Sequence, residues 1–239
     1  MNLAIVCPMA NEARTAEGFV TEVLAACEAL GEARFLAVLD RVSRDGTFDI
    51  LRALERRERR LTVVWAPENR CVVDAYVRGY REALASKAGW ILEIDAGYSH
   101  RPADVPAFLR TIEQGYECAF GTRFGKGGRL VNSSLRRRMI SQGGTLVTNL
   151  LLRTQLSDMT SGFQLFRRDI LEDILRKGIV SRSPFFQTEM KAYCMKRHYA
   201  EVPILYSMAS HNVSAGSIKE SFQQLFRLYG LKRSGRLAI

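Results

Sequence analysis

Short apolar runs alternate with helix-length amphipathic segments through the first half of the chain. The apolar runs predict β-strands over residues 3–9, 34–40, 61–67, 90–95 and 116–123. The segments between them predict helices over 13–30, 47–59 and 70–86 and from about residue 103. Strands separated by helix-length connections are typical of βαβ units, in which neighbouring strands run parallel. The pattern therefore predicts an α/β fold with a mostly parallel central sheet.

The second half of the chain follows a less regular pattern. We expect a helix over about 133–152, a turn leading into a strand over 158–166, a helix over 185–198, a strand over 200–207 and a closing helix. Repeats, low-complexity tracts and linkers are absent from the sequence. We therefore expect a single domain over residues 1–239, with one half over about 1–123, a second over 124–220 and a C-terminal amphipathic helix over 217–236.

Polar clusters follow most of the predicted strands. They lie at residues 8–12, 40–47, 67–70, 95–100 and 123–128. In parallel α/β sheets, ligands bind at the carboxyl ends of the strands. The sequence therefore predicts a ligand site along this edge.

Composition narrows the ligand and the setting. The formal net charge is +10, which favours a polyanionic or phosphate-bearing partner. The basic residues are dispersed and not interleaved with aromatic residues, so we do not expect nucleic-acid binding. The five cysteines are scattered without a C-x-x-C pair, which argues against a zinc site and against a disulfide framework and fits a reducing compartment. With no long apolar span or signal peptide, we expect a cytoplasmic protein, at most peripheral at a membrane surface.

The segment from Glu93 to Pro102 carries the strongest local signal. Asp95 closes a buried strand, where a carboxylate is costly unless a cation or hydrogen-bond donors meet it. Mg²⁺ or Mn²⁺ bridging a diphosphate is the natural partner, because these ions take one or two carboxylates together with phosphate oxygens. The alternative is that Asp95 caps the following loop without a ligand.

Ordered motifs resemble those of a known family. In the first half they are Pro8-x-x-Asn11-Glu12, Asp40-x-x-Ser43-x-Asp45-Gly46-Thr47, Asn69-Arg70 and Asp95-Ala96-x-x-Ser99-His100-x-Pro102. In the second half they are Gly121-Thr122-Arg123-Phe124, Arg137-x-x-x-Ser141, Asp158-x-Thr160-Ser161-Gly162-Phe163 and Glu201-Val202-Pro203-Ile204. Together they resemble the inverting family-2 glycosyltransferases of GT-A fold, and within them the polyprenyl-phosphate (dolichyl-phosphate) mannose synthase branch.

The resemblance implies a fold, a reaction and a set of site residues. The implied fold is a three-layer α/β/α sandwich with a Rossmann-like nucleotide-binding half, and the implied reaction transfers a hexose from a GDP- or UDP-hexose to a phosphate-bearing lipid. The residues that would bind the donor are Pro8, Asn11, Glu12, Asp40, Asn69 and Arg70. Asp95 would bind the metal or diphosphate. The acceptor phosphate would be bound by Arg123, Arg137 and Ser141. Asp158 would lie beside the sugar, orienting a hydroxyl or acting as a base.

Two departures from the family pattern keep alternatives open. The family's Asp-x-Asp is here Asp95-Ala96-Gly97, so the second metal ligand is missing and the need for a metal is uncertain. The family's late loop arginine is also absent, which leaves His211 or Lys219 to contact the diphosphate. The alternatives are transfer to a hydroxyl of a soluble molecule or glycan, with Asp158 or Glu189 as base, and a non-catalytic nucleotide-binding relic.

The closing helix predicts an amphipathic surface. Phe222, Leu225, Phe226 and Tyr229 follow i, i+3, i+4, i+7 spacing and have a basic rim. Such a helix rests on an anionic membrane or packs on the core, and the sequence leaves both possibilities open.

Overall fold

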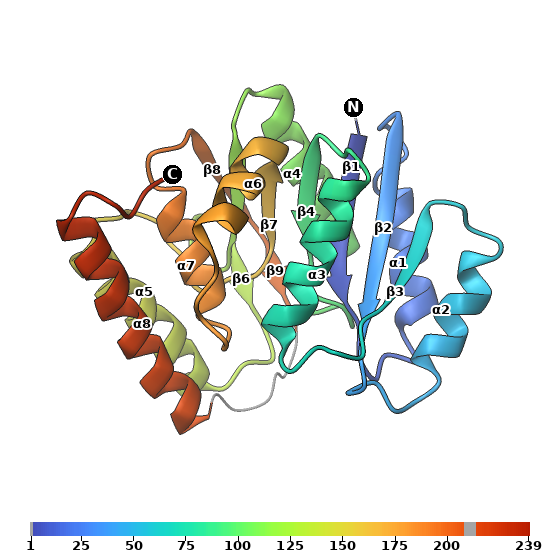
Figure 1. Cartoon of the computed structure of the whole chain (residues 1–239), viewed down its shortest axis with the longest axis horizontal. Coiled ribbons are helices and arrows are strands. Elements are labelled where there is room, and N and C mark those ends of the chain that lie inside the picture. Colours follow the sequence, from blue (N-terminus) through green and yellow to red (C-terminus); the bar gives the residue numbers. More distant parts are fainter. Residues whose placement is uncertain (1, 208–213) are drawn as a thin grey trace.

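The computed structural model describes residues 2–207 and 214–239. Its strands are β1 (Asn2–Pro8), β2 (Glu32–Leu39), β3 (Leu61–Trp65), β4 (Trp90–Glu93), β5 (Cys118–Thr122), β6 (Arg129–Leu130), β7 (Gln164–Arg167), β8 (Tyr199–Pro203) and β9 (Leu205–Tyr206). Its helices are α1 (Ala16–Ala25), α2 (Thr47–Glu55), α3 (Val72–Ala85), the 3₁₀ turn η1 (Pro102–Asp104), α4 (Val105–Glu113), α5 (Leu135–Leu152), α6 (Arg168–Lys177), α7 (Phe186–Tyr193) and α8 (Ala215–Arg233). The chain course is shown in Figure 1.

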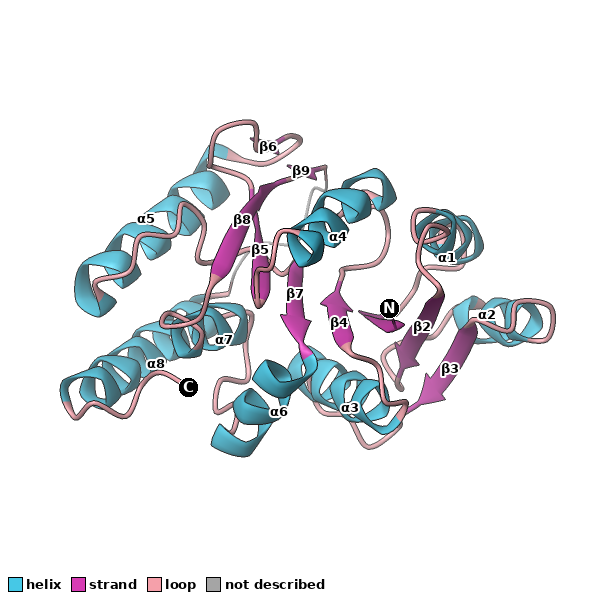
Figure 2. Cartoon of the chain, turned by 90° about the horizontal axis from the view of Figure 1, so that it is seen from above, coloured by secondary structure: helices cyan, strands magenta, loops and turns pink. Residues whose placement is uncertain are grey.

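Seven strands form one sheet in the order β3-β2-β1-β4-β7-β5-β8. Only β7 runs antiparallel to its two neighbours in this sheet, β4 and β5, and the other pairs are parallel. The mostly parallel α/β sheet predicted from the sequence is therefore confirmed. Figure 2 shows helices on both sides of the strands, which completes the three layers.

Alternating side chains of the strands feed two hydrophobic cores. On β1, Leu3 and Ile5 join the core beneath α1, α2 and α4, whereas Ala4 and Val6 join the core beneath α3, α6 and α7. Gly79 lets α3 approach the sheet closely, since a Cβ there would lie 2.3 Å from Cγ1 of Val6. This close approach brings the hydroxyl groups of Tyr76 and Tyr80, on the buried side of α3, to the end of β4.

Two elements of the second half, β6 and α6, were not predicted from the sequence. The two-residue β6 pairs only with β9, in a small separate sheet, and is too short to give a periodic signal. Helix α6 did have a signal, because its buried residues Ile170, Leu171 and Ile174 follow helical spacing. The motif from Asp158 to Phe163 lies shortly before this helix, and only a turn and a strand were predicted there.

The strand order reverses at β1, which has β2 on one side and β4 on the other. In open α/β sheets, ligands bind outside the carboxyl ends of the strands at such a reversal of strand order. Here the loops after β1 and β4 cover residues 9–15 and 94–101. No helix among residues 2–207 and 214–239 is long and apolar enough to cross a membrane.

Candidate active site

The loops after β1 and β4 touch through Glu12 and Gly97. Gly97 has a φ of +67°, and a Cβ added there would lie 2.7 and 2.8 Å from the two carboxylate oxygens of Glu12. The Glu12 carboxylate also accepts a hydrogen bond from Thr15 Oγ1 at 2.5 Å. The backbone conformation and the neighbouring carboxylate therefore both favour glycine at position 97.

Asp95 lies at the carboxyl edge of the sheet with 37% of its side chain exposed. The hydroxyl of Tyr76, from α3, donates to Asp95 Oδ1. His100 Nδ1 accepts the Asp95 backbone N–H at 3.0 Å, so the proton of the neutral ring resides on Nε2. Burial lowers the pKa of His100 to about 4 despite the nearby Asp95 charge. The 3.7 Å approach of His100 Nδ1 to Asp95 Oδ2 is thus no ion pair at neutral pH.

The predicted donor-binding residues of the first two loops are brought together. Asn11 Nδ2 donates to the Val42 carbonyl at 3.1 Å, and its Oδ1 accepts the Arg44 N–H at 3.0 Å. Asp40 Oδ1 accepts the Val42 N–H at 2.9 Å. Pro8 ends β1 directly before this region. Asn11 therefore joins the two loops, and Asp40 shapes the turn after β2.

Asn69 and Arg70 follow β3 and differ in environment. Asn69 Nδ2 is buried, and no hydrogen-bond acceptor lies near it in the part of the chain that the structure describes. An amide donor without a partner is costly, so Asn69 is suited to a polar ligand atom. Arg70 is largely exposed, with its Nε 3.6 Å from Asp74 Oδ2.

Arg123 and Asp158 form a buried ion pair. Arg123 Nε donates to Asp158 Oδ2 at 2.7 Å and Nη2 to Oδ1 at 2.9 Å, and neither side chain is more than 4% exposed. Burial by itself raises the pKa of Asp158, but the Arg123 guanidinium outweighs it and lowers the pKa to about 2. Thr160 Oγ1 also lies 2.5 Å from Arg123 Nη2. Asp158 is therefore an ionised partner of Arg123 and has almost no tendency to accept a proton at neutral pH.

Glu189, the other candidate base, is also fully enclosed. Its carboxylate accepts hydrogen bonds from the backbone N–H groups of Val180 and Ser181, from the Tyr193 hydroxyl and from Arg227. The side chain has no exposed surface. These contacts join α7 to α8 and leave the carboxylate no access to a substrate.

Tyr206 connects the predicted acceptor residues with the donor edge. Its ring lies 5.4 Å from the Arg123 guanidinium and 5.3 Å from the His100 ring. Burial raises the pKa of Tyr206, and the charges of Asp95, Arg137 and Arg123 all act on the same hydroxyl. Of the predicted residues, Arg123 therefore lies beside the Tyr206 ring, and Asp95 and Arg137 lie close enough for their charges to act on its hydroxyl. Sequence reasoning missed Tyr206, whose only local signal is its place near the end of an apolar run.

Arg137 and Ser141 lie one turn apart at the beginning of α5. Ser134 caps the helix, since its Oγ accepts the Arg137 N–H at 3.3 Å. The N-terminal end of a helix attracts anions through its free N–H groups and its dipole. Of the two residues proposed for the late loop, Lys219 lies on α8 and His211 lies outside the described residues.

Behind Asp95 lies a second carboxylate that the sequence analysis did not assign. Glu93 is fully buried, and the Tyr80 hydroxyl and Gln187 Nε2 both donate to it. Burial raises the pKa of Glu93 to about 8, although these two hydrogen bonds oppose the rise. Tyr76 and Tyr80, one turn apart on α3, therefore hold the two carboxylates of the β4 end in place.

The site fits a divalent metal through one protein carboxylate. In residues 2–207 and 214–239, no three His, Cys, Asp or Glu side chains gather as a ligand set. Mg²⁺ is commonly held by one or two carboxylates together with substrate phosphates and water, so Asp95 alone is compatible with it. The space that a second Asp would need at position 97 is occupied by Glu12.

Comparisons with known proteins give matches over most of the chain. The model of the family described as Glycosyl transferase family 2 matches residues 4–175. The chain is 28% identical over 195 residues to an undecaprenyl-phosphate mannosyltransferase of Micrococcus luteus, covering 80% of each chain. It is 26% identical over 236 residues to a polyprenol monophosphomannose synthase of Mycolicibacterium smegmatis, covering 98% of this chain and 88% of the relative.

Solved structures share the fold at lower identity. Glucosyl-3-phosphoglycerate synthase from Mycobacterium tuberculosis, in complex with Mn²⁺, UDP and glucosyl-3-phosphoglycerate, matches with a TM-score of 0.67 and 16% identity, over 98% of this chain and 80% of that chain. The same enzyme with Mg²⁺ and UDP gives a TM-score of 0.64 and 17% identity, over 98% and 79%. This likeness confirms the GT-A fold expected from the sequence motifs.

Proposed function

Because the chain belongs to glycosyl transferase family 2, we propose that it transfers a hexose of mannose or glucose type from a nucleotide sugar to a polyprenyl phosphate, with inversion. Two relatives that match most of the chain bear the names of a polyprenyl-phosphate mannosyltransferase and a polyprenol monophosphomannose synthase. The observation that carries the proposal is the partly exposed carboxylate of Asp95. It lies where the strand order reverses, which is the place where α/β sheets bind nucleotides.

The donor would lie across the loops after β1, β2 and β4. Asp40 and Glu12 supply acceptors for base or ribose donors, and the unpaired amide of Asn69 supplies a donor. A divalent metal held by Asp95 would, when bound, neutralise charge on the leaving nucleoside diphosphate. Asp95 would keep the required orientation through its hydrogen bond from Tyr76.

The acceptor phosphate would lie at the beginning of α5. Arg137 and the positive end of the α5 helix dipole attract an anion there, and Arg guanidinium groups match phosphate oxygens in shape and charge. A phosphate monoester is already ionised near neutral pH and needs no general base. This agrees with the environments of Asp158 and Glu189, which are both buried and bound to arginine. A hydroxyl acceptor would need a free base, and neither of these carboxylates provides one.

We place the reaction at the cytoplasmic face of a membrane. All five cysteines are free, and four of them are buried, which supports a reducing setting. A polyprenyl phosphate resides in a bilayer, so the enzyme would have to meet the membrane at its surface.

Transfer assays with matched acceptors test this function. Purified protein is incubated with GDP-mannose or UDP-glucose, Mn²⁺ and either undecaprenyl phosphate or undecaprenol in detergent micelles. We expect hexose transfer to the phosphate and none to the alcohol, and we expect Asp95→Asn to lower turnover by about 100-fold or more. Transfer to the alcohol at a similar rate, or full activity of the variant, would refute the proposal.

A further inference from the structure

Helix α5 exposes its apolar residues and buries polar ones. Leu135, Met139, Leu146 and Leu150 are 74%, 64%, 70% and 76% exposed. At 100° per residue they fall within a narrow sector of the helix, which we call the α5 stripe. The buried residues of α5 are Thr145, Thr148 and Leu152. A helix with leucines outside and threonines inside lacks the usual arrangement of a helix in contact with water, and its outer face calls for a covering partner.

Helix α8 packs against α5 (Figure 1). It also has exposed apolar residues of its own. Leu225 and Leu228 are buried against the core, whereas Phe222 and Phe226 are 51% and 62% exposed. The predicted amphipathic helix therefore packs on the core through one side and leaves two phenylalanines uncovered. Tyr229 and Arg233 continue the same sector of the helix, which we call the α8 stripe.

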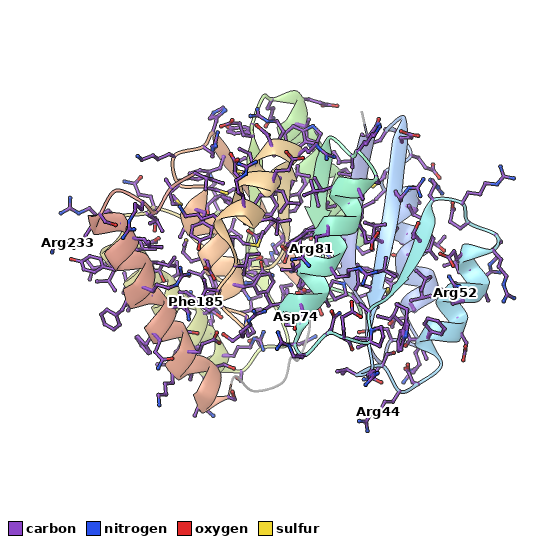
Figure 3. All side chains as sticks on the ribbon, viewed as in Figure 1. Arg44, Arg52, Asp74, Arg81, Phe185 and Arg233 are labelled. Atoms are coloured by element: carbon purple, nitrogen blue, oxygen red, sulfur yellow. The ribbon has the colours of Figure 1, made fainter. Side chains whose placement is uncertain are left out.

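A basic cavity joins the two stripes. It has a volume of about 480 Å³ and is lined by Leu150, Leu151, Arg153, Tyr229, Lys232 and Arg233. Leu150 belongs to the α5 stripe, and Tyr229 and Arg233 belong to the α8 stripe, so both stripes open onto one face. Arg233 projects at the outer edge of the molecule (Figure 3).

The charge around this face is of one sign. From residue 118 to residue 157 the chain contains no Asp or Glu, but it has one lysine and six arginines, which include three in succession at 136–138 and one at 153. On α8 the single acid, Glu220, accepts the Arg182 N–H, while Lys232 and Arg233 line the cavity. An apolar surface with a basic rim is complementary to an anionic lipid bilayer.

We infer that the face formed by the α5 and α8 stripes docks on an anionic bilayer, with lipid phosphates at the basic cavity. This inference rests on the proposed function, because a lipid acceptor has to be reached from the membrane. The first turn of α5 carries Arg137, which we propose to bind the acceptor phosphate. Docking through α5 therefore brings the acceptor end of the site to the lipid surface. A second copy of the chain fits less well, because a two-fold interface sets each patch against a patch of the same sign.

Vesicle co-sedimentation tests the docking. The probes are vesicles of phosphatidylcholine alone and of phosphatidylcholine mixed with phosphatidylglycerol, and we expect binding to the mixture and little to phosphatidylcholine. Leu146→Gln with Leu150→Gln removes apolar contacts, and we expect about a tenfold or greater loss of binding. Arg153→Asn with Arg233→Gln removes two positive charges from the cavity, and we expect roughly a twentyfold loss of vesicle binding. Asn is chosen at position 153 because it tolerates the left-handed backbone conformation that Arg153 adopts.

A matched control and two further readouts separate the possible failures. Val180→Gln changes another exposed apolar residue and is expected to bind vesicles as the unaltered chain does. Nucleotide release with a short, water-soluble prenyl phosphate should stay unchanged in both double variants, so loss of docking is distinguishable from loss of catalysis. Equal vesicle binding by all variants would overturn the inference. The inference would also be overturned if the unaltered chain bound no vesicles and formed a dimer in sedimentation velocity that the Leu146→Gln, Leu150→Gln variant did not form. That result would assign the face to a second copy of the chain.

Discussion

The carboxyl edge of the sheet and the polar interior beneath it use charged side chains in opposite ways. At the edge, Asp95 remains partly exposed, and the loop residues Asn11 and Asp40 bond mainly to nearby backbone groups. In the interior, Asp158 and Glu189 are fully enclosed, and each is bound to an arginine. The edge therefore keeps groups available to a ligand, whereas the interior uses its charges to hold distant segments together.

The largest expected effect comes from removing a buried carboxylate of the interior. Asp158→Ala leaves the Arg123 guanidinium buried without a counter-ion, and we expect the free energy of unfolding to fall by about 3–5 kcal/mol. The matched change at the edge, Asp40→Ala, removes one turn hydrogen bond and should cost only about 1 kcal/mol. Urea unfolding of both variants measures the difference. Equal losses of unfolding free energy in the two variants would show that charged side chains at the edge and in the interior do not differ in this way.

The next effect concerns Glu93 and pH. Its pKa is about 8 in the folded chain against an ordinary value of 4.5, so its contribution to stability is fully present below pH 4.5 and is lost as pH rises to 8. For His100, whose pKa is lowered, the contribution to stability grows as pH rises from 4 and has reached its full value above pH 6.5. Lys191, with a pKa lowered to about 8 mainly by burial, adds stability only above that pH. Between pH 6.5 and 8, the change of the unfolding free energy with pH is therefore caused mainly by Glu93.

We expect the unfolding free energy of the chain to fall by about 2 kcal/mol between pH 6.5 and 8. Glu93→Gln keeps the shape of the protonated acid and cannot ionise, so this variant should lose the slope. Urea unfolding at a series of pH values measures it. A slope that persists in the variant would show that a group other than Glu93 causes it and would contradict the prediction.

The smallest expected effect lies at the edge, in Gly97→Asp. This change rebuilds the family motif in the sequence, but the new Cβ would meet the Glu12 carboxylate, and the backbone there is left-handed. We expect a stability loss of about 1 kcal/mol and no gain in the thermal shift produced by Mn²⁺. A larger Mn²⁺-induced shift than in the unaltered chain would show that Glu12 moves aside and that a second ligand was simply missing.

The sequence predicted the edge better than the interior for a physical reason. Strands β1 to β5 follow local apolar runs, and the chemistry at their ends lies within a few residues of each strand. Asp95 and Asp40 were proposed as site residues in this way. The placement of these residues follows from strand direction alone, because parallel strands end at one edge.

The interior depends on contacts between distant segments. Arg123 and Asp158 are 35 residues apart and meet only because β5 and the loop before β7 adjoin in the sheet. Tyr76 and Tyr206 reach the site through the close approach of α3 and the packing around His100. A single sequence carries no local mark of such pairings. The motif resemblance named Arg123 and Asp158, but not that they bind each other.

The most direct test of the account measures how Mn²⁺ changes nucleotide binding at Asp95. Dissociation constants for UDP and GDP are determined by isothermal titration calorimetry, with and without Mn²⁺, for the unaltered chain, for Asp95→Asn and for the control Asp173→Asn on α6. The account predicts that Mn²⁺ tightens binding of one nucleotide about tenfold or more in the unaltered chain and the control, and not in Asp95→Asn. Equal tightening in Asp95→Asn, or no binding of either nucleotide by the unaltered chain, would contradict it.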